Sequence, residues 1–387
     1  MPIVDGIVAL QEEVRDWRRH LHRNPELLFG VHQTAAFAAR KLHSFGCDVV
    51  ETGIGRTGVV GTIKGNRGDG PVIGLRADMD ALPIQETGGC AWASAVPGKM
   101  HACGHDGHMA MLLGAAKYLA ETRNFRGSVT VIFQPAEEGG AGGLEMVKDG
   151  MMEKFGIAEV YGMHNRPGLP IGSFATRKGA IMAAADEFEI AVHGRGGHAS
   201  QPHSTVDPVV VAAQIITGLQ VIVSRETNPM RSVAVTVATM HAGEASNVIP
   251  THATLTGTVR TLDPEIRSFA KRRLSEIATG IAAAYGARAE VRYPRGYPVV
   301  LNHAETTGRV IEVLRKVAGE AAVDANVSPS LGAEDFSYML KARPGTLVFI
   351  GNGNTAGLHN PTYDFNDEAI SFGISYWVSL AEAILAD

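Results

Sequence analysis

Segments of strand character alternate with segments of helical character along most of this chain. After two amphipathic helices, the pattern predicts a mixed series of elements: helices at 4–24, 32–46, 106–121 and 142–149, and strands at 58–64, 71–77, 127–133 and 158–163. Such alternation is typical of a mostly parallel sheet that is covered by helices on both faces. Functional sites in these sheets form at the carboxyl ends of the strands, and ligand-type side chains follow several of the strands predicted here.

The pattern changes near residue 185 and returns near residue 296. Between these points the order is strand-helix-strand-strand-helix-strand, at 187–193, 205–224, 231–241, 251–261, 264–286 and 288–293. This is the order of the split ferredoxin-like unit. The alternation then resumes with a helix at 304–318, a strand at 345–350 and a helix at 367–385. We therefore expect an α/β/α domain formed by residues 1–184 and 296–387, interrupted by an inserted α+β domain at 185–295.

Composition narrows the class of protein. The chain has 387 residues, which exceeds one ordinary core, and its net charge of −5 offers no basic surplus for nucleic acid or an anionic membrane. The first twenty residues carry acids within the apolar run, unlike a signal peptide, and the longest apolar stretch, Pro208–Val223, is judged too short to span a bilayer. Three cysteines do not suggest a disulfide framework. We expect a cytoplasmic protein that acts on a small molecule.

The segment Met100–His108 concentrates three imidazoles, a thiol and a carboxylate in nine residues. Cys103 and His105 flank Gly104, which lets the backbone bend so that both side chains can face one point. Thiolate, imidazole and carboxylate are the ligands that a borderline-soft divalent metal prefers. Taken singly, Cys103 is more often a buried small hydrophobe and His105 a helix-cap residue, but such a dense cluster suits a packed core poorly. The segment therefore predicts a metal site.

Two adjacent glutamates, Glu137 and Glu138, follow an apolar strand and precede glycines. Neighbouring carboxylates repel unless they share a cation or a proton. Metal-assisted hydrolysis needs both a carboxylate ligand and a base that takes a proton from the attacking water, so the pair suits these two roles. His164 ends one predicted strand and His359 follows another, although each alone is more often a loop histidine. Five ligands from distant segments can hold two ions when bridging groups share coordination.

Two neighbouring histidines and a glycine-rich segment have other interpretations. His108 lies three residues after His105 on a helix, so it can share a face with His105 or hydrogen-bond a carboxylate behind the ligands. We place His101 and His108 outside the set of direct ligands.

The segment Gly194–Ala199 matches the letters of a dinucleotide-binding fingerprint, but the prolines that follow delay the required helix, and no nicotinamide cofactor is expected.

These motifs resemble those of the aminoacylase/carboxypeptidase superfamily of co-catalytic metallopeptidases. Within it, the chain is most similar to the amidohydrolase branch, which contains hippurate hydrolases, N-acyl-amino-acid amidohydrolases and indole-acetyl-amino-acid hydrolases. The resemblance covers nearly the whole chain in order, through His22–Glu26, Arg76–Pro83, Met100–His108, Pro135–Gly139, Gly162–His164, Gly196–Ser200, Asn247–Pro250, Gly257–Arg260, Gly332–Phe336 and Leu358–Asn360.

The resemblance implies roles for individual residues. It implies that Glu137 is the general base and that the metal ligands are Cys103, His105, Glu138, His164 and His359. It also implies a catalytic domain interrupted by a lid domain that dimerises. Other branches have a His-x-Asp motif where this chain has Asp78-Met79-Asp80, and a bridging Asp near the position of His105, so their ligand sets do not transfer. We expect Asp78 and Asp80 to orient the ligands instead.

Three residues of the inserted domain resemble substrate-contacting residues of the family. His198 resembles the histidine that reaches the partner subunit's active site and stabilises the tetrahedral oxyanion, a role that lowers a barrier by a few kcal/mol. Asn247 and Arg260 resemble the pair that holds the carboxylate of the substrate, and arginine offers a planar two-pronged donor for that purpose. Without the resemblance, Asn247 would be interpreted as a turn residue and Arg260 as a solvated strand arginine.

The leading hypothesis is a dinuclear metal amidohydrolase that cleaves an N-acyl or N-aroyl amino acid to a carboxylic acid and a free amino acid. Its cofactors would be two divalent ions, Mn or Zn, with Co and Ni also suited to the ligands. We expect a homodimer or a higher homo-oligomer, without a nucleic-acid or membrane partner. Three alternatives stay open: a dipeptidase or carboxypeptidase on the same scaffold, a non-catalytic metal-dependent binding protein, and thiol hydrolysis by Cys103 with a histidine base.

Overall fold

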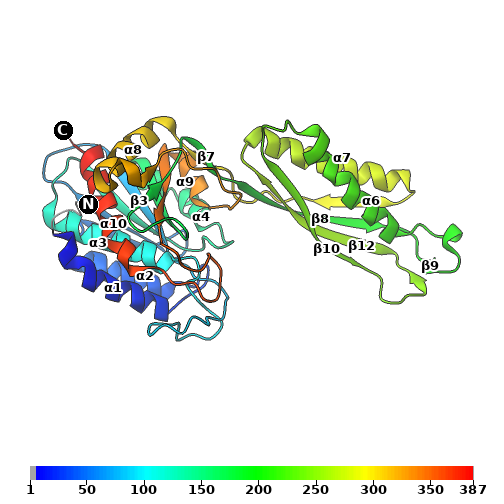
Figure 1. The fold of residues 1–387 in the computed structure, drawn as a ribbon, viewed down its shortest axis with the longest axis horizontal. Coiled ribbons are helices and arrows are strands. Elements are labelled where there is room, and N and C mark those ends of the chain that lie inside the picture. Colours follow the sequence, from blue (N-terminus) through cyan, green and yellow to red (C-terminus); the bar gives the residue numbers. More distant parts are fainter. Residues whose placement is uncertain (1–5, 387) are drawn as a thin grey trace. The chain divides into compact units, whose positions relative to one another are not determined.

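The computed structural model describes residues 6–386, which cluster into two compact units (Figure 1). Unit 1 contains the described residues up to Ile181, residues Leu301–Ser328 and the residues from Asp335 onward. Unit 2 contains Met182–Val300 and the short segment Pro329–Glu334. Unit 2 is therefore an insertion in the chain of unit 1.

Unit 1 is built around a mixed sheet that has eight strands among the described residues, in the order β1-β2-β4-β3-β5-β16-β6-β15. Strands β4, β3, β5 and β16 in its centre are parallel, whereas β1 and β2 on one side pair antiparallel. The strands are β1 (Val49–Ile54), β2 (Gly58–Lys64), β3 (Val72–Asp78), β4 (Ser128–Gln134), β5 (Ile157–Arg166), β6 (Phe174–Ala175), β15 (Val323–Asp324) and β16 (Gly345–Gly351). The predicted α/β class is confirmed.

Both faces of the central strands are buried, as their sequence requires. Along β3, Ile73 and Leu75 join the main core, while the alternate residue Gly74 lies against Ile132 and Val160. Two groups of helices supply this cover. One group contains α1 (Ile7–Arg23), α2 (His32–Ser44), α3 (His105–Thr122), α8 (Ala304–Ala318) and α10 (Ile370–Ile384), and the other contains α4 (Gly142–Lys148), α5 (Met151–Lys154) and α9 (Phe336–Ala342). The parallel strands therefore end in an enclosed setting.

Most long elements lie where the sequence predicts them, with small shifts at their ends. Residues 4 and 5 of the helix predicted at 4–24 lie outside the described residues. The C-terminal helix begins at Ile370 rather than at residue 367, because Asp367–Ala369 forms a 3-10 turn (η4). The short strands β7 (Gly179–Met182) and β14 (Val300–Asn302) form a two-stranded ladder that the sequence pattern does not predict.

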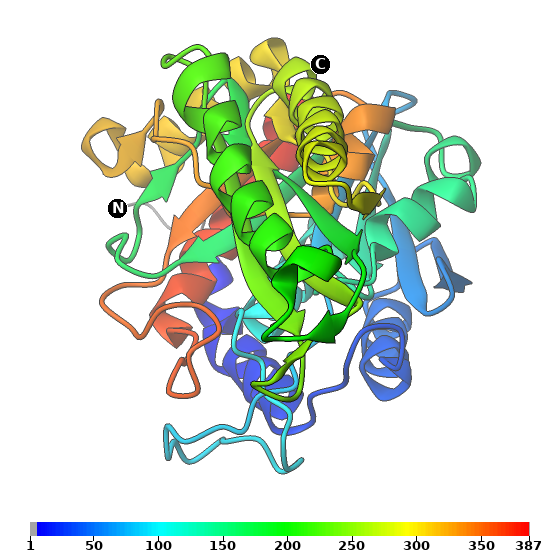
Figure 2. The same ribbon diagram turned by 90° about the vertical axis from the view of Figure 1, so that its right-hand side faces the viewer.

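Unit 2 contains an antiparallel sheet in the order β10-β12-β8-β13, with two helices side by side on one face (Figures 1 and 2). Its elements are β8 (Ala184–His193), α6 (Pro208–Val221), β10 (Val233–Ala242), β12 (His252–Thr261), α7 (Pro264–Ala284) and β13 (Arg288–Arg292). Along β8, buried Phe188 and Ile190 alternate with exposed Glu187 and Glu189, so the helices cover one face only. This strand order is that of the split ferredoxin-like unit expected from the sequence.

The helix predicted at 205–224 begins later and ends later than expected. Asp207 accepts the backbone N–H of Val209 at 2.9 Å and Pro208 occupies the first turn, a favourable pairing for a helix start. A π-helical turn at Ile222–Glu226 (η2) then extends the helix. The resulting segment, Pro208–Glu226, has 19 residues and is long and apolar enough to cross a membrane.

The helix is longer than the apolar stretch Pro208–Val223, because the π-helical turn continues it to Glu226. Buried core helices meet the same criteria of length and composition, so this finding does not make the segment a membrane span. In unit 2 the segment packs on the sheet through Val211, Ile215 and Leu219, which share a core with strand residues such as Phe188. Only 33% of the apolar stretch of this segment is buried, so the face of the helix that points away from the sheet exposes apolar residues such as Val210.

Candidate metal centre

Cys103 and His105 flank the start of α3, where the backbone takes a conformation that requires glycine. Gly104 has a φ of +84°, and a Cβ added there would lie 2.3 Å from Asn165 Nδ2 and 2.5 Å from Tyr363 Oη. The Asn165 amide donates to the carbonyl oxygen of Cys103 at 2.6 Å. The close approach of these groups fixes the turn, so both candidate ligands are held at the helix N-terminus.

The two adjacent glutamates are held by one carboxylate. Glu137 and Glu138 follow β4, and their backbone N–H groups donate to the two oxygens of Asp80 at 2.9 and 3.1 Å. The backbone carbonyl of Asp80 in turn accepts Nδ1–H of His105 at 2.7 Å. This bond directs the other ring nitrogen, Nε2, toward the glutamates. A residue just after the end of β3 thus positions groups on both α3 and the turn after β4.

The two remaining candidate ligands come from distant strands. His164 on β5 donates from Nδ1 to the carbonyl oxygen of Asn165 at 2.7 Å, and its Nε2 lies 3.5 Å from Cys103 Sγ. His359 follows β16 and has a φ of +64°. Its Nε2 lies 3.2 Å from Glu138 Oε1. His164 is buried, whereas His359 is partly open to solvent.

The structure brings the five candidate ligands and Glu137 together. Their ligand atoms lie within 4.8 Å of one another in three overlapping groups: Cys103, His105 and His164; Cys103, Glu138 and His359; and His105, Glu137 and Glu138. In the part of the chain that the structure describes, the buried Nε2 of His105 has no hydrogen-bond partner. A buried imidazole nitrogen without a partner, directed at carboxylates and a thiol, fits a metal ligand.

Burial and charge set the protonation of these groups. Burial raises the pKa of the Cys103 thiol well above its usual value. Burial lowers the pKa of His164 to about 3, so its imidazole is neutral. The hydrogen bond with Glu138 raises the pKa of His359. Because thiolate and neutral imidazole are the forms that bind metal, binding at this centre must release protons.

His108 and Asp78 lie behind the ligands. Nδ1 of His108 donates to Asp78 Oδ1 at 2.6 Å, and its Nε2 accepts the backbone N–H of Asn165 at 2.9 Å. Both ring nitrogens are thus occupied by the protein. Arg76 donates to the other Asp78 oxygen at 2.7 Å. Burial opposes ionisation of Asp78, but the charge of Arg76 and the hydrogen bond from His108 keep its pKa well below its usual value.

Three residues that the sequence pattern does not identify, Arg76, Asn165 and Tyr363, hydrogen-bond the groups behind the candidate ligands. Arg76 also donates to Asp335 at 3.1 Å, and Tyr363 donates to Asn165 Oδ1 at 2.8 Å. The available signal was position, because Arg76 and Asn165 stand near strand ends beside predicted site residues. His101 is buried, and neither of its ring nitrogens has a hydrogen-bond partner among residues 6–386.

His198 and Asn247 lie together in unit 2. His198 is in the short strand β9 (Gly197–His198), which pairs with β11 (Val248–Ile249). The Asn247 carbonyl oxygen accepts the backbone N–H of Ala199 at 3.0 Å. His198 Nδ1 accepts the backbone N–H of Ser200 at 3.1 Å, so a neutral ring carries its proton on Nε2. The exposed His198 therefore offers a hydrogen-bond donor.

Arg260 lies elsewhere in unit 2. It is opposite Ala185 on β8, whereas His252, where β12 begins, is opposite His193. The eight residue steps from Ala185 to His193 correspond to about 26 Å at about 3.3 Å per residue, and Asn247 and His198 lie beyond the His193 end. The structure therefore does not bring Asn247 and Arg260 of one chain together.

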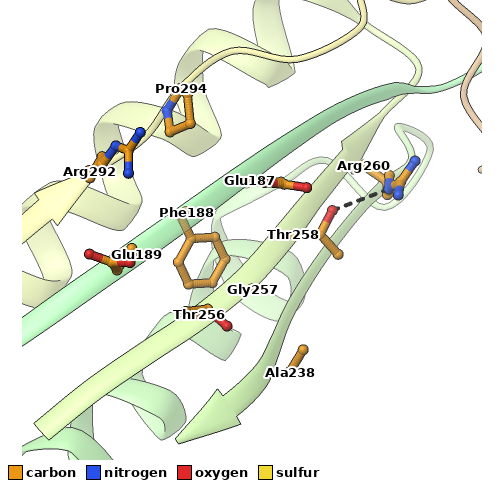
Figure 3. A pocket seen from close by; sticks show the side chains of 10 residues that line it. All are labelled: Glu187, Phe188, Glu189, Ala238, Thr256, Gly257, Thr258, Arg260, Arg292 and Pro294. Atoms are coloured by element: carbon orange, nitrogen blue, oxygen red, sulfur yellow. Dashed lines mark hydrogen bonds between the residues drawn. The ribbon is translucent and has the colours of Figure 1, made fainter. Parts of the chain in front are cut away.

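Arg260 borders a hollow on the face of the unit 2 sheet that lacks helices (Figure 3). The hollow has a volume of about 500 Å³ and is lined by residues from all four strands, including Glu187, Thr258, Arg260 and Arg292. Arg260 Nε donates to Thr258 Oγ1 at 3.2 Å (Figure 3). This bond leaves the terminal nitrogens of the guanidinium for other acceptors.

A thiol, imidazoles and paired carboxylates at the ends of parallel strands define the class of metal-dependent hydrolases. Residues 74–383 match the model of peptidase family M20/M25/M40, and the chain belongs to this family. The resemblance inferred from the motifs is thus confirmed, and the protein is an enzyme of the metal-dependent amidohydrolase class.

Named relatives cover nearly the whole chain. It is 42% identical over 381 residues to hippurate hydrolase of Campylobacter jejuni, covering 98% of this chain and 99% of the relative. It is 40% identical over 400 residues to thermostable carboxypeptidase 2 of Saccharolobus solfataricus, covering 100% and 98%. A solved Bacillus subtilis structure, described as a dinuclear metal-binding peptidase of the M20 family, has 36% identity and a TM-score of 0.86, covering 98% of this chain and 99% of that chain.

Proposed function

We propose that the protein hydrolyses the amide bond of N-acyl or N-aroyl amino acids, releasing a carboxylic acid and a free amino acid. The observation that carries this proposal is the convergence of five ligand-type side chains around Glu137. The similarity to a hippurate hydrolase over nearly the full length of both chains supports the substrate class. The half-buried guanidinium of Arg260 suits the carboxylate that such substrates carry.

We propose that two divalent ions are held by Cys103, His105, Glu138, His164 and His359. The unpartnered Nε2 of His105 and the overlapping ligand groups support this assignment, as does the similarity to a dinuclear metal-binding peptidase. The mixed sulfur, nitrogen and oxygen donors suit Mn or Zn, and also Co or Ni. When bound, the ions lower the pKa of a water molecule and polarise the amide carbonyl.

Glu137 is proposed to move the proton. Its backbone is fixed by Asp80, and its carboxylate lies within 4.8 Å of ligand atoms of His105 and Glu138. It takes a proton from the attacking water and returns it to the nitrogen of the leaving amine as the amide bond breaks. His198 donates from Nε2 to the oxygen that becomes negative in the tetrahedral intermediate.

We propose that the protein acts as a homodimer and that unit 2 is both its lid and its dimerisation domain. Asn247 and Arg260 lie at opposite ends of the unit 2 sheet, so one carboxylate can contact both only if they come from different chains. Among residues 6–386, strand β10 pairs with β12 alone and leaves its other edge open, and α6 exposes apolar residues beside it. Such features suit association of two copies.

The proposed role of Glu137 is tested by Glu137→Gln. Hippurate hydrolysis should fall by about 10²- to 10⁴-fold, the usual contribution of a general base. The bound metal per chain should stay unchanged, because the residue is not a proposed ligand. Glu121→Gln, on the exposed end of α3, is the matched control and should hydrolyse hippurate normally. Near-normal turnover by Glu137→Gln would overturn the assignment.

Carboxypeptidase or dipeptidase activity is a second candidate, favoured by the 40% identity to a thermostable carboxypeptidase. The two activities differ in whether the site accepts a free amino group on the acyl side. Comparing kcat/KM for hippurate with that for dipeptides separates them, and a preference for dipeptides would favour the second candidate.

We also propose a cytoplasmic location, since a reducing compartment keeps the free thiol of Cys103 available to metal.

A further inference from the structure

A second cluster of metal-type ligands lies in unit 1 outside the proposed metal centre. His22 near the end of α1 faces Glu86 and Cys90, which belong to the loop between β3 and α3. His22 Nε2 lies 3.3 Å from Glu86 Oε1, and Cys90 Sγ lies 3.6 Å from the same oxygen. The three ligand atoms lie within 4.8 Å of one another. None of these residues has a role in the proposed reaction.

These separations fit a tetrahedral zinc ion. With bonds of about 2.0–2.1 Å to nitrogen, about 2.0–2.2 Å to oxygen and about 2.3 Å to sulfur, ligand atoms lie about 3.3 to 3.6 Å apart. The observed distances of 3.3 and 3.6 Å match the nitrogen–oxygen and oxygen–sulfur values. A thiolate, an imidazole and a carboxylate also form a donor set that zinc prefers.

The groups behind the ligands hold them in a metal-binding orientation. Nδ1–H of His22 donates to Asp106 at 2.8 Å, so Nε2 is the nitrogen that faces the cluster. The second oxygen of Glu86 accepts the backbone N–H of Ser94 at 2.6 Å, which leaves Oε1 for an ion. A carboxylate behind a histidine is the usual support of a zinc-bound imidazole. Cys90 is half-buried, so water can reach a fourth position.

Two carboxylates flank the imidazole of His22. Asp106 Oδ2 lies 2.8 Å from Nδ1 and Glu86 Oε1 lies 3.3 Å from Nε2. The negative charge of these carboxylates favours a cation at this position. The guanidinium of Arg18 pairs with Asp364 at 3.0 Å and with Asp367 at 2.6 Å, and that of Arg23 donates to the carbonyl oxygen of Ala91 at 2.6 Å.

We propose that His22, Glu86 and Cys90 form a further divalent-metal site, separate from the pair of ions at the metal centre, with zinc as its ion and water as the fourth ligand. Binding replaces the proton of the Cys90 thiol and any proton on His22 Nε2, and both leave to solvent. The ion would fasten the loop after β3 to α1. Through Asp106 it would also support the first turn of α3, next to His105.

Metal content tests the proposal directly. Protein saturated with zinc and freed of excess metal should hold one more zinc ion per chain than the variant Cys90→Ala treated in the same way. Cys47→Ala, which removes another half-buried free cysteine, is the matched control and should keep the wild-type content. Equal zinc content in wild type and Cys90→Ala would overturn the proposal.

Cobalt substitution supplies an independent test that does not depend on hydrolysis. In a Cys103→Ala background the proposed metal centre has no thiolate, so a thiolate-to-cobalt absorption band should remain and come from Cys90. Adding Cys90→Ala should abolish the band, whereas adding Cys47→Ala should not. Folding is checked by circular dichroism, and folded Cys103→Ala without such a band would contradict the site. Since neither readout is activity, failure here leaves the proposed hydrolase function unaffected, and loss of hydrolysis in Glu137→Gln does not bear on this site.

Discussion

At the scale of single residues, Asp80 connects the two halves of the metal centre. Its carboxylate accepts the backbone N–H groups of Glu137 and Glu138, and its carbonyl oxygen accepts from His105. Asp80→Ala removes both carboxylate acceptors, and a buried donor left without a partner costs about 1–3 kcal/mol. We expect a lower Tm, reduced metal content and strongly reduced hydrolysis, measured on the same preparation.

A matched control separates the effect on the site from the effect on stability. Asp149 accepts the backbone N–H of Gly55 at 2.7 Å, outside the metal centre. Asp149→Ala should therefore lower the Tm but leave metal content and hydrolysis near wild type, whereas Asp80→Asn, which keeps one oxygen acceptor, should lose less than Asp80→Ala. Unchanged metal content and activity in Asp80→Ala would contradict the positioning role.

The types of residue at the centre were readable from the sequence, but their connections were not. Cys103, His105 and the glutamate pair stand out because thiol, imidazole and adjacent carboxylates are rare together outside metal sites. That Asp80 supports two backbone N–H groups depends on β3 and β4 lying side by side, which no local pattern encodes. The role of Arg76 likewise follows from its contact with Asp335, 259 positions later in the chain.

At the scale of elements, the turn that begins α3 determines whether two ligands face the same point. Gly104→Ala adds a Cβ that would lie 2.3 Å from Asn165 Nδ2 and 2.5 Å from Tyr363 Oη, at a φ of +84°. The left-handed conformation alone costs about 1–2 kcal/mol for a residue with a Cβ. The collision adds to this cost and displaces the turn. We expect Gly104→Ala to lose metal and hydrolytic activity, measured by metal analysis and a hippurate assay.

The backbone strain and the collision can be tested separately. Gly150 has a φ of +75° at the start of α5, and a Cβ there would meet nothing within 4 Å. Gly150→Ala therefore carries the strain without the collision, and should lower the Tm while keeping metal and activity. If Gly104→Ala bound metal as well as Gly150→Ala, the collision would have no effect on the centre.

Long elements were predictable because their pattern persists over many residues. The helix at 304–318 and the strand at 58–64 have the predicted bounds. The elements that the sequence pattern does not predict are short, such as the seven-residue α9, or lie at the sheet edge, such as β1. Strand β1 has only one buried residue and shows no regular alternation of buried and exposed positions, so its sequence gives no clear period.

At the scale of the whole molecule, the order of elements predicted the two architectures, because short connections and right-handed crossovers leave few arrangements for such an order. The separation of Asn247 from Arg260 within unit 2 was not predictable, since it depends on where each residue stands in the sheet register. Because of that separation, the proposed dimer is needed to assemble the substrate-binding residues. An active site that needs both residues must take them from two chains.

Mixing inactive variants tests this arrangement. Glu137→Gln lacks the proposed base and His198→Ala lacks the proposed oxyanion donor, so each alone should be nearly inactive. If His198 serves the partner's site, a mixed dimer contains one complete site, formed by Glu137 of one chain and His198 of the other. Random exchange in an equal mixture should then restore about a quarter of wild-type activity, as follows from a two-fold symmetric dimer. The measurement is hippurate hydrolysis after subunit exchange, with heterodimers verified by differently tagged chains. His203→Ala, a nearby exposed histidine, should be active before mixing. Heterodimers that form without any recovery of activity would show that His198 does not act across the dimer.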